Sequence, residues 1–122
     1  MTPRRESAKS SIPIANLEEG RPTVQEALGR LDRALGVARN QKVQILKLIH
    51  GYGSSGTGGD IRIAVQLRLT EMARNGQIVA CIFGENWSRS DEQAWKLIQS
   101  RPGLKQDSDL GRKNLGITVV VL

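Results

Sequence analysis

The feature that most constrains this chain is the stretch from residue 44 to residue 62, where a short apolar run leads into a glycine-rich segment. Residues 44–49 are mainly apolar and are followed by His50 and Gly51. That run has the length of a buried strand and is too short for a typical helix. Five glycines lie between positions 51 and 59, and an amphipathic run begins near Asp60. The pattern predicts a strand, a loop and a helix.

The glycines of this loop determine what it can contact. Without Cβ atoms, the backbone can approach another molecule closely and direct several N–H groups at it. The start of the next helix adds free N–H groups and the positive end of the helix dipole, so an anion is the expected ligand. A plain flexible connection is the alternative. The loop has neither the Gly-Lys-Ser/Thr ending of a Walker loop nor the third glycine of a dinucleotide fingerprint.

His50 is the only histidine, and it stands where the predicted strand meets the loop. Two roles are open for it: hydrogen bonding to local backbone, or contact with a phosphate and proton transfer near neutral pH. A zinc site needs more nitrogen or sulfur ligands than one histidine and one cysteine, Cys81, can supply. We therefore expect no metal and no cofactor.

The charge of the chain favours a polyanionic partner. The net charge is +6 and the pI is about 10.1, and nucleic acid is the most common partner of such proteins. The 122 residues suffice for one domain with one core. The lone Cys81 favours a reducing compartment, and no signal peptide or long apolar run is visible. We expect a cytoplasmic monomer that does not bind a membrane.

The order of segments predicts an α/β domain. Residues 1–11 are polar and basic and are expected to form a flexible tail, which leaves residues 12–122 as the folded domain. Strands are predicted at residues 12–17, 44–49, 77–83 and 116–122, and helices at 23–40, 60–75 and 90–100. The order βαβαβαβ indicates a single two-layer or sandwich domain with a mixed sheet.

Side chains at the expected helix starts refine these boundaries. Thr23 lies three residues before Glu26, and Ser90 lies three residues before Gln93, which is the spacing of a capping box. Asp60 is expected to cap the helix between them.

The outer strands also carry signals. Pro13 cannot donate to a sheet ladder, so the first strand is expected at an edge, with Ile12 and Ile14 on one face. The segment 77–83 is nearly all apolar and is expected to be covered on both faces.

Several of these segments together resemble the small MutS-related (Smr) domain. The matching pieces are the capped helix start at 23–28, the His-Gly-x-Gly sequence at 50–53, Ile61 and Arg62 where the family has Leu-Arg, and the closing residues 114–122. The resemblance spans about residues 12–122 in the family's order. It implies a fold like the C-terminal domain of translation initiation factor 3 and a DNA or RNA partner, which several members of the family cleave.

The resemblance also implies which residues meet the nucleic acid. His50, Gly51, Gly53 and Arg62 would line the phosphate-binding surface, and a metal is not a consistent requirement in the family. With the rest of the loop and nearby basic residues, the expected contact residues are His50, Gly51, Tyr52, Gly53, Gly58, Gly59, Arg62, Arg112 and Lys113.

The chain departs from the family in its first strand. Members commonly carry Leu-Asp-Leu-His-Gly there, with the Asp and His implicated in cleavage, and neither side chain occurs in residues 14–20 of this chain. Tyr52 stands where a lysine is frequent, the loop is longer, and residues 87–112 enlarge a link that is usually short. We therefore expect nucleic-acid binding without efficient cleavage.

Two other functions stay open. One is a metal-independent endonuclease in which His50 moves a proton, supported by Arg62 and by Glu18 or Glu19. The other is an interaction module that docks on a ribosome or a repair complex through residues 87–112, with Trp87 and Trp95 as anchors.

Overall fold

The computed structural model describes residues 12–53 and 57–122. Its strands are β1 (Ile14–Asn16), β2 (Ile45–Ile49), β3 (Ala80–Phe83) and β4 (Ile117–Val121), and its helices are α2 (Val24–Asn40), α3 (Thr57–Arg74) and α4 (Glu92–Ser100). The short 3₁₀ helices η1 (Gly84–Asn86) and η2 (Pro102–Gln106) flank α4. The predicted βαβαβαβ order is confirmed. The tail predicted at residues 1–11 lies outside the described residues.

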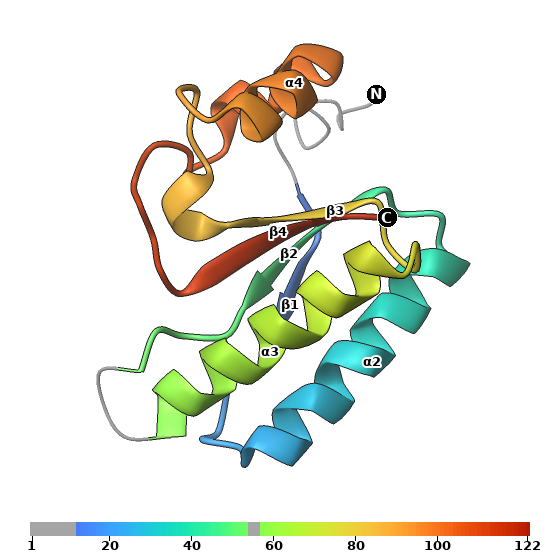
Figure 1. Cartoon of the computed structure of the whole chain (residues 1–122), viewed down its shortest axis with the longest axis vertical. Coiled ribbons are helices and arrows are strands. Elements are labelled where there is room, and N and C mark those ends of the chain that lie inside the picture. The colour runs from blue at the N-terminus through green and yellow to red at the C-terminus, as the bar shows by residue number, and fades with distance from the viewer. Residues whose placement is uncertain (1–11, 54–56) are drawn as a thin grey trace, which may run out of the picture.

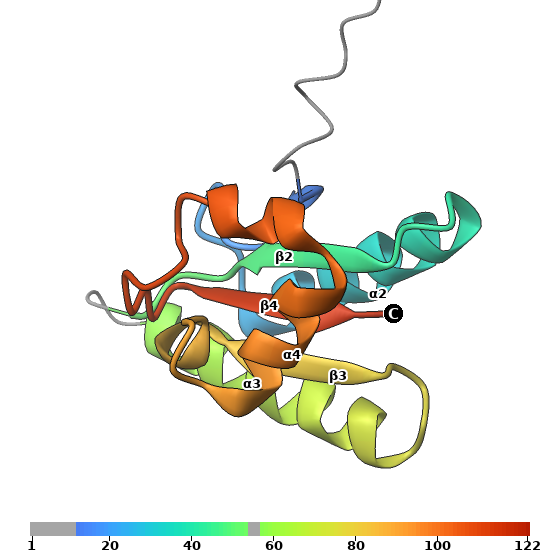
Figure 2. The same cartoon turned by 90° about the horizontal axis from the view of Figure 1, so that it is seen from above.

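In the described part of the chain, four strands form one mixed sheet in the order β1-β2-β4-β3 (Figures 1 and 2). β1 runs parallel to β2, while β4 is antiparallel to both of its neighbours, β2 and β3. The strand that comes last in the sequence therefore lies inside the sheet, and its Val119 and Val120 are fully buried. β1 lies at an edge, as Pro13 predicts.

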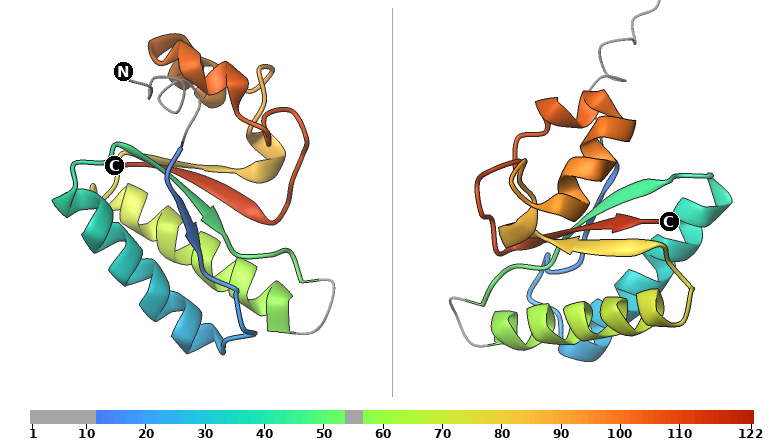
Figure 3. Two further views of the ribbon diagram at one scale, coloured as in Figure 1. Left: turned by 180° about the vertical axis from the view of Figure 1, so that it is seen from behind. Right: turned by 45° about the horizontal axis from the view of Figure 1, so that its top comes forward.

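The sheet lies between two layers of helices (Figure 3). Helices α2 and α3 lie side by side on one face, and α4 with the 3₁₀ helices covers the other. Alternate residues of β2 serve the two layers, because Leu46 and Leu48 pack in the core beneath α2 and α3 while Ile45 packs in the core beneath α4. The sandwich arrangement with a mixed sheet is thus confirmed.

Helix α2 begins as its sequence predicts. The Thr23 hydroxyl accepts a hydrogen bond from the Glu26 backbone N–H at 3.0 Å, and the Glu26 carboxylate accepts one from the Thr23 N–H at 2.8 Å. This reciprocal pair satisfies two N–H groups that the helix itself cannot bond. The inner face of the helix buries Ala27, Leu31, Leu35 and Ala38.

Helix α3 begins at Thr57, three residues earlier than the predicted start at Asp60. Asp60 therefore lies in the first turn and does not cap the helix, although its carboxylate still faces the positive end of the dipole. The two glycines that suggested loop structure are helical, because the low helix propensity of glycine is a weak constraint beside tertiary packing. Within the described residues, no helix is both long and apolar enough to cross a membrane.

Both edge strands are shorter than predicted. β1 starts only at Ile14. Ile12 is buried in the core beneath α4, whereas Ile14 is exposed. β3 contacts both layers, as predicted, because Ile82 packs in the core beneath α4 and Cys81 packs against the core beneath α2 and α3. β3 is nevertheless an edge strand, since β4 takes the inner position. An apolar run alone does not tell an inner strand from an edge strand.

The segment around α4 differs from its prediction in two details. Asp91 caps the helix by accepting from the Ala94 N–H at 3.0 Å, whereas the Ser90 hydroxyl pairs with that of Ser88. Trp87 is fully buried and donates its indole N–H to Asp107 at 3.0 Å, so it is not an exposed anchor for a partner. The indole finds more apolar surface beneath α4 than at the protein surface.

Candidate nucleic-acid interface

The carboxyl ends of β1, β2 and β3 meet the amino end of β4 at one edge of the sheet, which we call the strand-end edge. The strand register pairs Asn16 with Ile49, Ile49 with Ile117, and Phe83 with Thr118. Open α/β sheets commonly bind ligands at the carboxyl ends of their strands. The residues next to these ends are Glu18 after β1, His50 and Gly51 after β2, Glu85 after β3, and Gly116 before β4.

His50 is fully buried behind the strand-end edge. Its Nδ1 lies 2.7 Å from the carbonyl oxygen of Gly51, and its Nε2 lies 2.9 Å from the hydroxyl of Thr118. A carbonyl can only accept a hydrogen bond, so Nδ1 carries the proton and Nε2 accepts from Thr118. Both ring nitrogens are thus engaged within the chain, and neither faces solvent.

The surroundings of His50 also fix its charge. Burial lowers the pKa of His50 below its ordinary value, and the positive charge of Arg62 acts in the same direction. The Gly51 carbonyl and the carboxylates of Glu18 and Glu85 oppose this shift without reversing it. The imidazole is therefore neutral at neutral pH, and in this arrangement it positions the first residues of the loop.

The first residues of the glycine-rich loop adopt a backbone that favours glycine. Gly51 has φ +75° and Gly53 has φ +86°, and a Cβ on Gly51 would overlap the carboxylate of Glu18. Between them the Tyr52 side chain is 56% exposed. The other end of the loop returns close by, since a Cβ on Gly59 would lie 3.9 Å from the Cα of Gly53. The exposed aromatic ring of Tyr52 therefore stands between two glycines in the left-handed region, the first of which lies against the Glu18 carboxylate.

The start of α3 supplies a charge to this edge. Gly58 and Gly59 belong to its first turn, where backbone N–H groups have no partner inside the helix. Arg62 follows, and its Nη2 lies 3.8 Å from the Glu85 carboxylate, beyond hydrogen-bond distance. Their side chains are 27% and 36% exposed. Arg62 is thus held close to the strand ends by a weak ion pair that an anionic ligand can replace.

Arg112 and Lys113 lie in the turn that leads into β4. Both are exposed, and Lys113 has φ +53°. The next residue, Asn114, accepts from the Gly116 N–H at 2.8 Å. The carbonyl of Gly116 in turn accepts from the N–H groups of His50 and Gly51 at 2.9 and 3.1 Å. The turn with its two cations is therefore joined directly to the start of the glycine-rich loop.

A buried ion cluster supports this turn from below. Lys47, which is 3% exposed, places its Nζ 2.8 Å from Asp107 and 2.6 Å from Asp109. Burial alone would lower the pKa of Lys47, but the two carboxylates outweigh it and raise that pKa. Burial would raise the pKa of Asp109, but Lys47 and Asn114 bond its carboxylate and lower it. Lys47 and Asp109 are therefore both charged at neutral pH.

The cluster reaches the strand-end edge through one side chain. The Asn114 amide donates to Asp109 at 3.0 Å, while its oxygen accepts from Gly116. Sequence reasoning did not single out Lys47, Asn114 or Thr118. Each gives a faint signal, because Lys47 and Thr118 are the polar residues of otherwise apolar strands and Asn114 precedes a glycine. Glu85 was also missed, whereas Glu18, one of the two carboxylates considered in the nuclease hypothesis, lies against Gly51.

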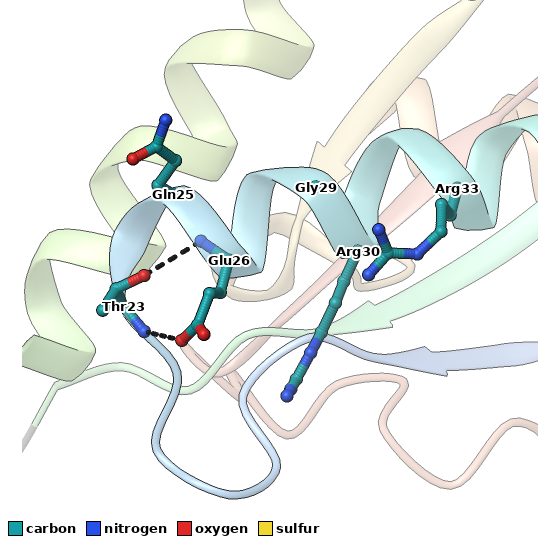
Figure 4. A pocket seen from close by; sticks show the side chains of 6 residues that line it. All are labelled: Thr23, Gln25, Glu26, Gly29, Arg30 and Arg33. Atoms are coloured by element: carbon teal, nitrogen blue, oxygen red, sulfur yellow. Dashed lines mark hydrogen bonds between the residues drawn. The ribbon is translucent and has the colours of Figure 1, made fainter.

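A separate polar pocket of about 440 Å³ lies along the first half of α2 (Figure 4). Arg30 extends from it toward the turn after β1, where its Nη1 donates to the carbonyls of Glu19 at 2.7 Å and Leu17 at 3.3 Å. Arg30 therefore holds that turn in place. None of the predicted contact residues lines this pocket; its lining is Thr23, Gln25, Glu26, Gly29, Arg30 and Arg33.

Among residues 12–53 and 57–122, no group of three or more His, Cys, Asp and Glu side chains is arranged to hold a metal ion. No protein-family model and no curated protein matches the sequence. The crystal structure of the Smr domain of Thermus thermophilus MutS2 matches the fold with a TM-score of 0.55 at 23% sequence identity. The match covers 91% of this chain and 98% of that one. This chain has an Smr-like fold.

Proposed function

We propose that this Smr-like domain binds nucleic acid at the strand-end edge and grips phosphates with the glycine-rich loop. The observation that carries the proposal is Arg62. Its charge is close enough to His50, at the start of the loop, to lower the pKa of that imidazole, and its only ion-pair partner among the described residues, Glu85, is 3.8 Å away. A phosphate offers Arg62 shorter, charge-assisted hydrogen bonds than this carboxylate does.

Other groups would extend this grip. The N–H groups in the first turn of α3 can donate to the same phosphate, assisted by the helix dipole. Arg112 and Lys113 add exposed positive charge on the neighbouring turn. The exposed ring of Tyr52 offers a surface on which a base or sugar can pack.

We infer binding rather than cleavage because of the state of His50. A general base needs a free nitrogen within reach of the proton that it takes, and both nitrogens of this buried imidazole are bonded to Gly51 and Thr118. The endonuclease alternative requires the loop to rearrange so that Nε2 leaves Thr118. It predicts cleavage that disappears in His50→Gln.

The test is a titration of labelled single-stranded RNA, duplex DNA and branched DNA at two salt concentrations, with the same samples run on a denaturing gel. We expect affinity to fall steeply with salt, because bound phosphates release counterions. Arg62→Gln should weaken binding about tenfold, in line with about 1.5–3 kcal/mol for a hydrogen bond to a charged group.

Arg74→Gln is the matched control. Arg74 lies at the other end of the same helix, is exposed, and pairs with Glu71 at 2.6 Å, so this change removes one charge without touching the strand-end edge. Binding that is insensitive to salt, or an equal loss in the two variants, would count against the proposal. Strand breaks that depend on His50 would favour the endonuclease.

A further inference from the structure

A small hollow lies between the exposed face of α3 and the edge strand β3. It has a volume of about 190 Å³ and is lined by Ile63, Gln66, Leu67, Thr70 and Phe83. This is below the roughly 300–1,000 Å³ of sites that take drug-sized ligands or cofactors. The hollow has room for one small planar group, and no residue of the predicted contact set lines it.

The hollow is lined largely by apolar side chains, but one of its lining residues, Gln66, carries an unpaired hydrogen-bond donor. Ile63 is 55% exposed and Leu67 is 66% exposed, and because they are four residues apart on α3 they form one apolar patch on its surface. The Gln66 amide nitrogen is buried without a hydrogen-bond partner among the described residues. Leaving such a donor unpaired costs about 1–3 kcal/mol. A ligand that fits here presents a flat apolar surface and an acceptor at its rim.

The hollow lies next to the proposed phosphate site, on the same helix α3. Gln66 follows Arg62 by four residues, so the two residues lie on one face of the helix, about 6 Å apart along its axis. From the other side, Glu85 pairs with Arg62 only two residues after Phe83. A phosphate held at Arg62 would thus lie about one helical turn from the hollow, which is close enough for the base of the same or the next nucleotide.

We propose that the hollow between α3 and β3 binds one unpaired nucleobase of a single-stranded nucleic acid whose phosphate is held at Arg62. The base lies against Phe83 and between Ile63 and Leu67, and the Gln66 amide donates to an acceptor on its edge. A base stacked inside a duplex cannot enter, so the domain prefers single strands. This inference rests on the proposed function and adds a contact with the nucleobase to the contacts with the phosphate.

The test compares a single-stranded DNA oligonucleotide with the same sugar–phosphate chain in which every base is replaced by an abasic residue. Stacking of one base contributes about 1–3 kcal/mol, so the full-length protein should bind the intact strand about tenfold more tightly than the abasic strand. Leu67→Ser should reduce this ratio to about threefold or less. Gln66→Leu should keep the ratio but remove the differences among poly-dA, poly-dC and poly-dT.

Val79→Ser is the matched control, since Val79 is 71% exposed beside β3 but does not line the hollow. It should leave the ratio unchanged. Equal binding of intact and abasic strands by the wild type would overturn the base site while leaving the phosphate grip standing. Failure to bind either strand would overturn both proposals.

Analytical ultracentrifugation of the same proteins tests whether a second copy of the chain occupies this surface instead of a nucleobase. A wild-type dimer that becomes a monomer in Leu67→Ser would show that the hollow is a contact between proteins and would overturn the nucleobase proposal. A monomer in both cases agrees with it.

Discussion

The Lys47 cluster and the strand-end edge both set a cation against carboxylates, yet they hold the charges in different ways. In the cluster, Lys47 is buried and lies within 2.8 Å of both Asp107 and Asp109. At the strand-end edge, Arg62 is about a quarter exposed and its distance to Glu85 is 3.8 Å. The first arrangement satisfies its ions within the chain, and the second leaves a cation able to change partners.

This difference separates charges that stabilise the fold from a charge that remains available to a ligand. The buried cluster fixes the turn at residues 107–114, and Asn114 carries that order to Gly116 and the start of the glycine-rich loop. Arg62 gains little from Glu85 in the free protein, so little is lost when a phosphate replaces that carboxylate. A rigid support beside a loosely held cation is the arrangement that a binding site requires.

The largest expected effect breaks the cluster. Lys47→Met leaves the nearly inaccessible carboxylate of Asp107 and the half-buried one of Asp109 without their cation, and we expect the free energy of unfolding in urea at pH 7 to fall by about 3–5 kcal/mol. Arg68→Met is the matched control, because the 2.9 Å pair between Arg68 and Asp32 is exposed and contributes about 0–1 kcal/mol. Similar losses in the two variants would mean that burial does not distinguish these ion pairs.

The next effect concerns His50 and its dependence on pH. Because the pKa of His50 is lowered in the folded state, the unfolded chain binds more protons below its ordinary pKa of about 6.5. The imidazole's contribution is complete above that pH and is lost as the pH falls through the folded-state pKa. We expect the free energy of unfolding to fall between pH 7 and pH 5 in the wild type.

His50→Gln should remove that fall, and urea unfolding at several pH values measures it. The comparison is clean because His50 is the only histidine of the chain. The comparison uses the slope of the free energy of unfolding against pH and not its absolute value. A general destabilisation by the variant therefore does not affect the result. A variant with the slope of the wild type would show that His50 is not the titrating group.

The smallest expected effect concerns the Arg62–Glu85 pair at the strand-end edge. Glu85→Gln removes the carboxylate that competes with phosphate for Arg62, so single-stranded nucleic acid should bind about two- to threefold more tightly at low salt. The free energy of unfolding should change by less than about 0.5 kcal/mol. Asp32→Asn, which frees Arg68 in the same way, should leave binding unchanged. A weaker complex with Glu85→Gln would indicate that this carboxylate contacts the ligand.

The parts of the fold that follow from local sequence could be predicted. The spacing of Thr23 and Glu26 marks the start of α2 because a capping box involves only neighbouring residues. The strand–loop–helix order around His50 follows from one apolar run and its glycines. Helix α3 could not be placed to the residue, since its first glycines are helical only in the context of the packed domain.

The parts that depend on distant residues could not be predicted. Lys47 meets carboxylates about sixty positions later in the sequence, and one polar residue in an apolar strand does not say which acids it will find. Trp87 looked like an exposed anchor because nothing nearby shows that Asp107 accepts its indole N–H. The contact residues of the loop were expected from a resemblance, and their roles stay proposals that the experiments above address.

The inner position of β4 has a consequence for how the chain is made. Ribosomes deliver β1, β2 and β3 first, yet β2 and β3 share no ladder and each needs β4 as its neighbour. Until residue 121 has left the exit tunnel, the sheet cannot close, because β3 has no partner strand and β2 is paired on one side only, with β1. We expect the domain to fold late and in one cooperative step, and to depend on chaperones while it waits.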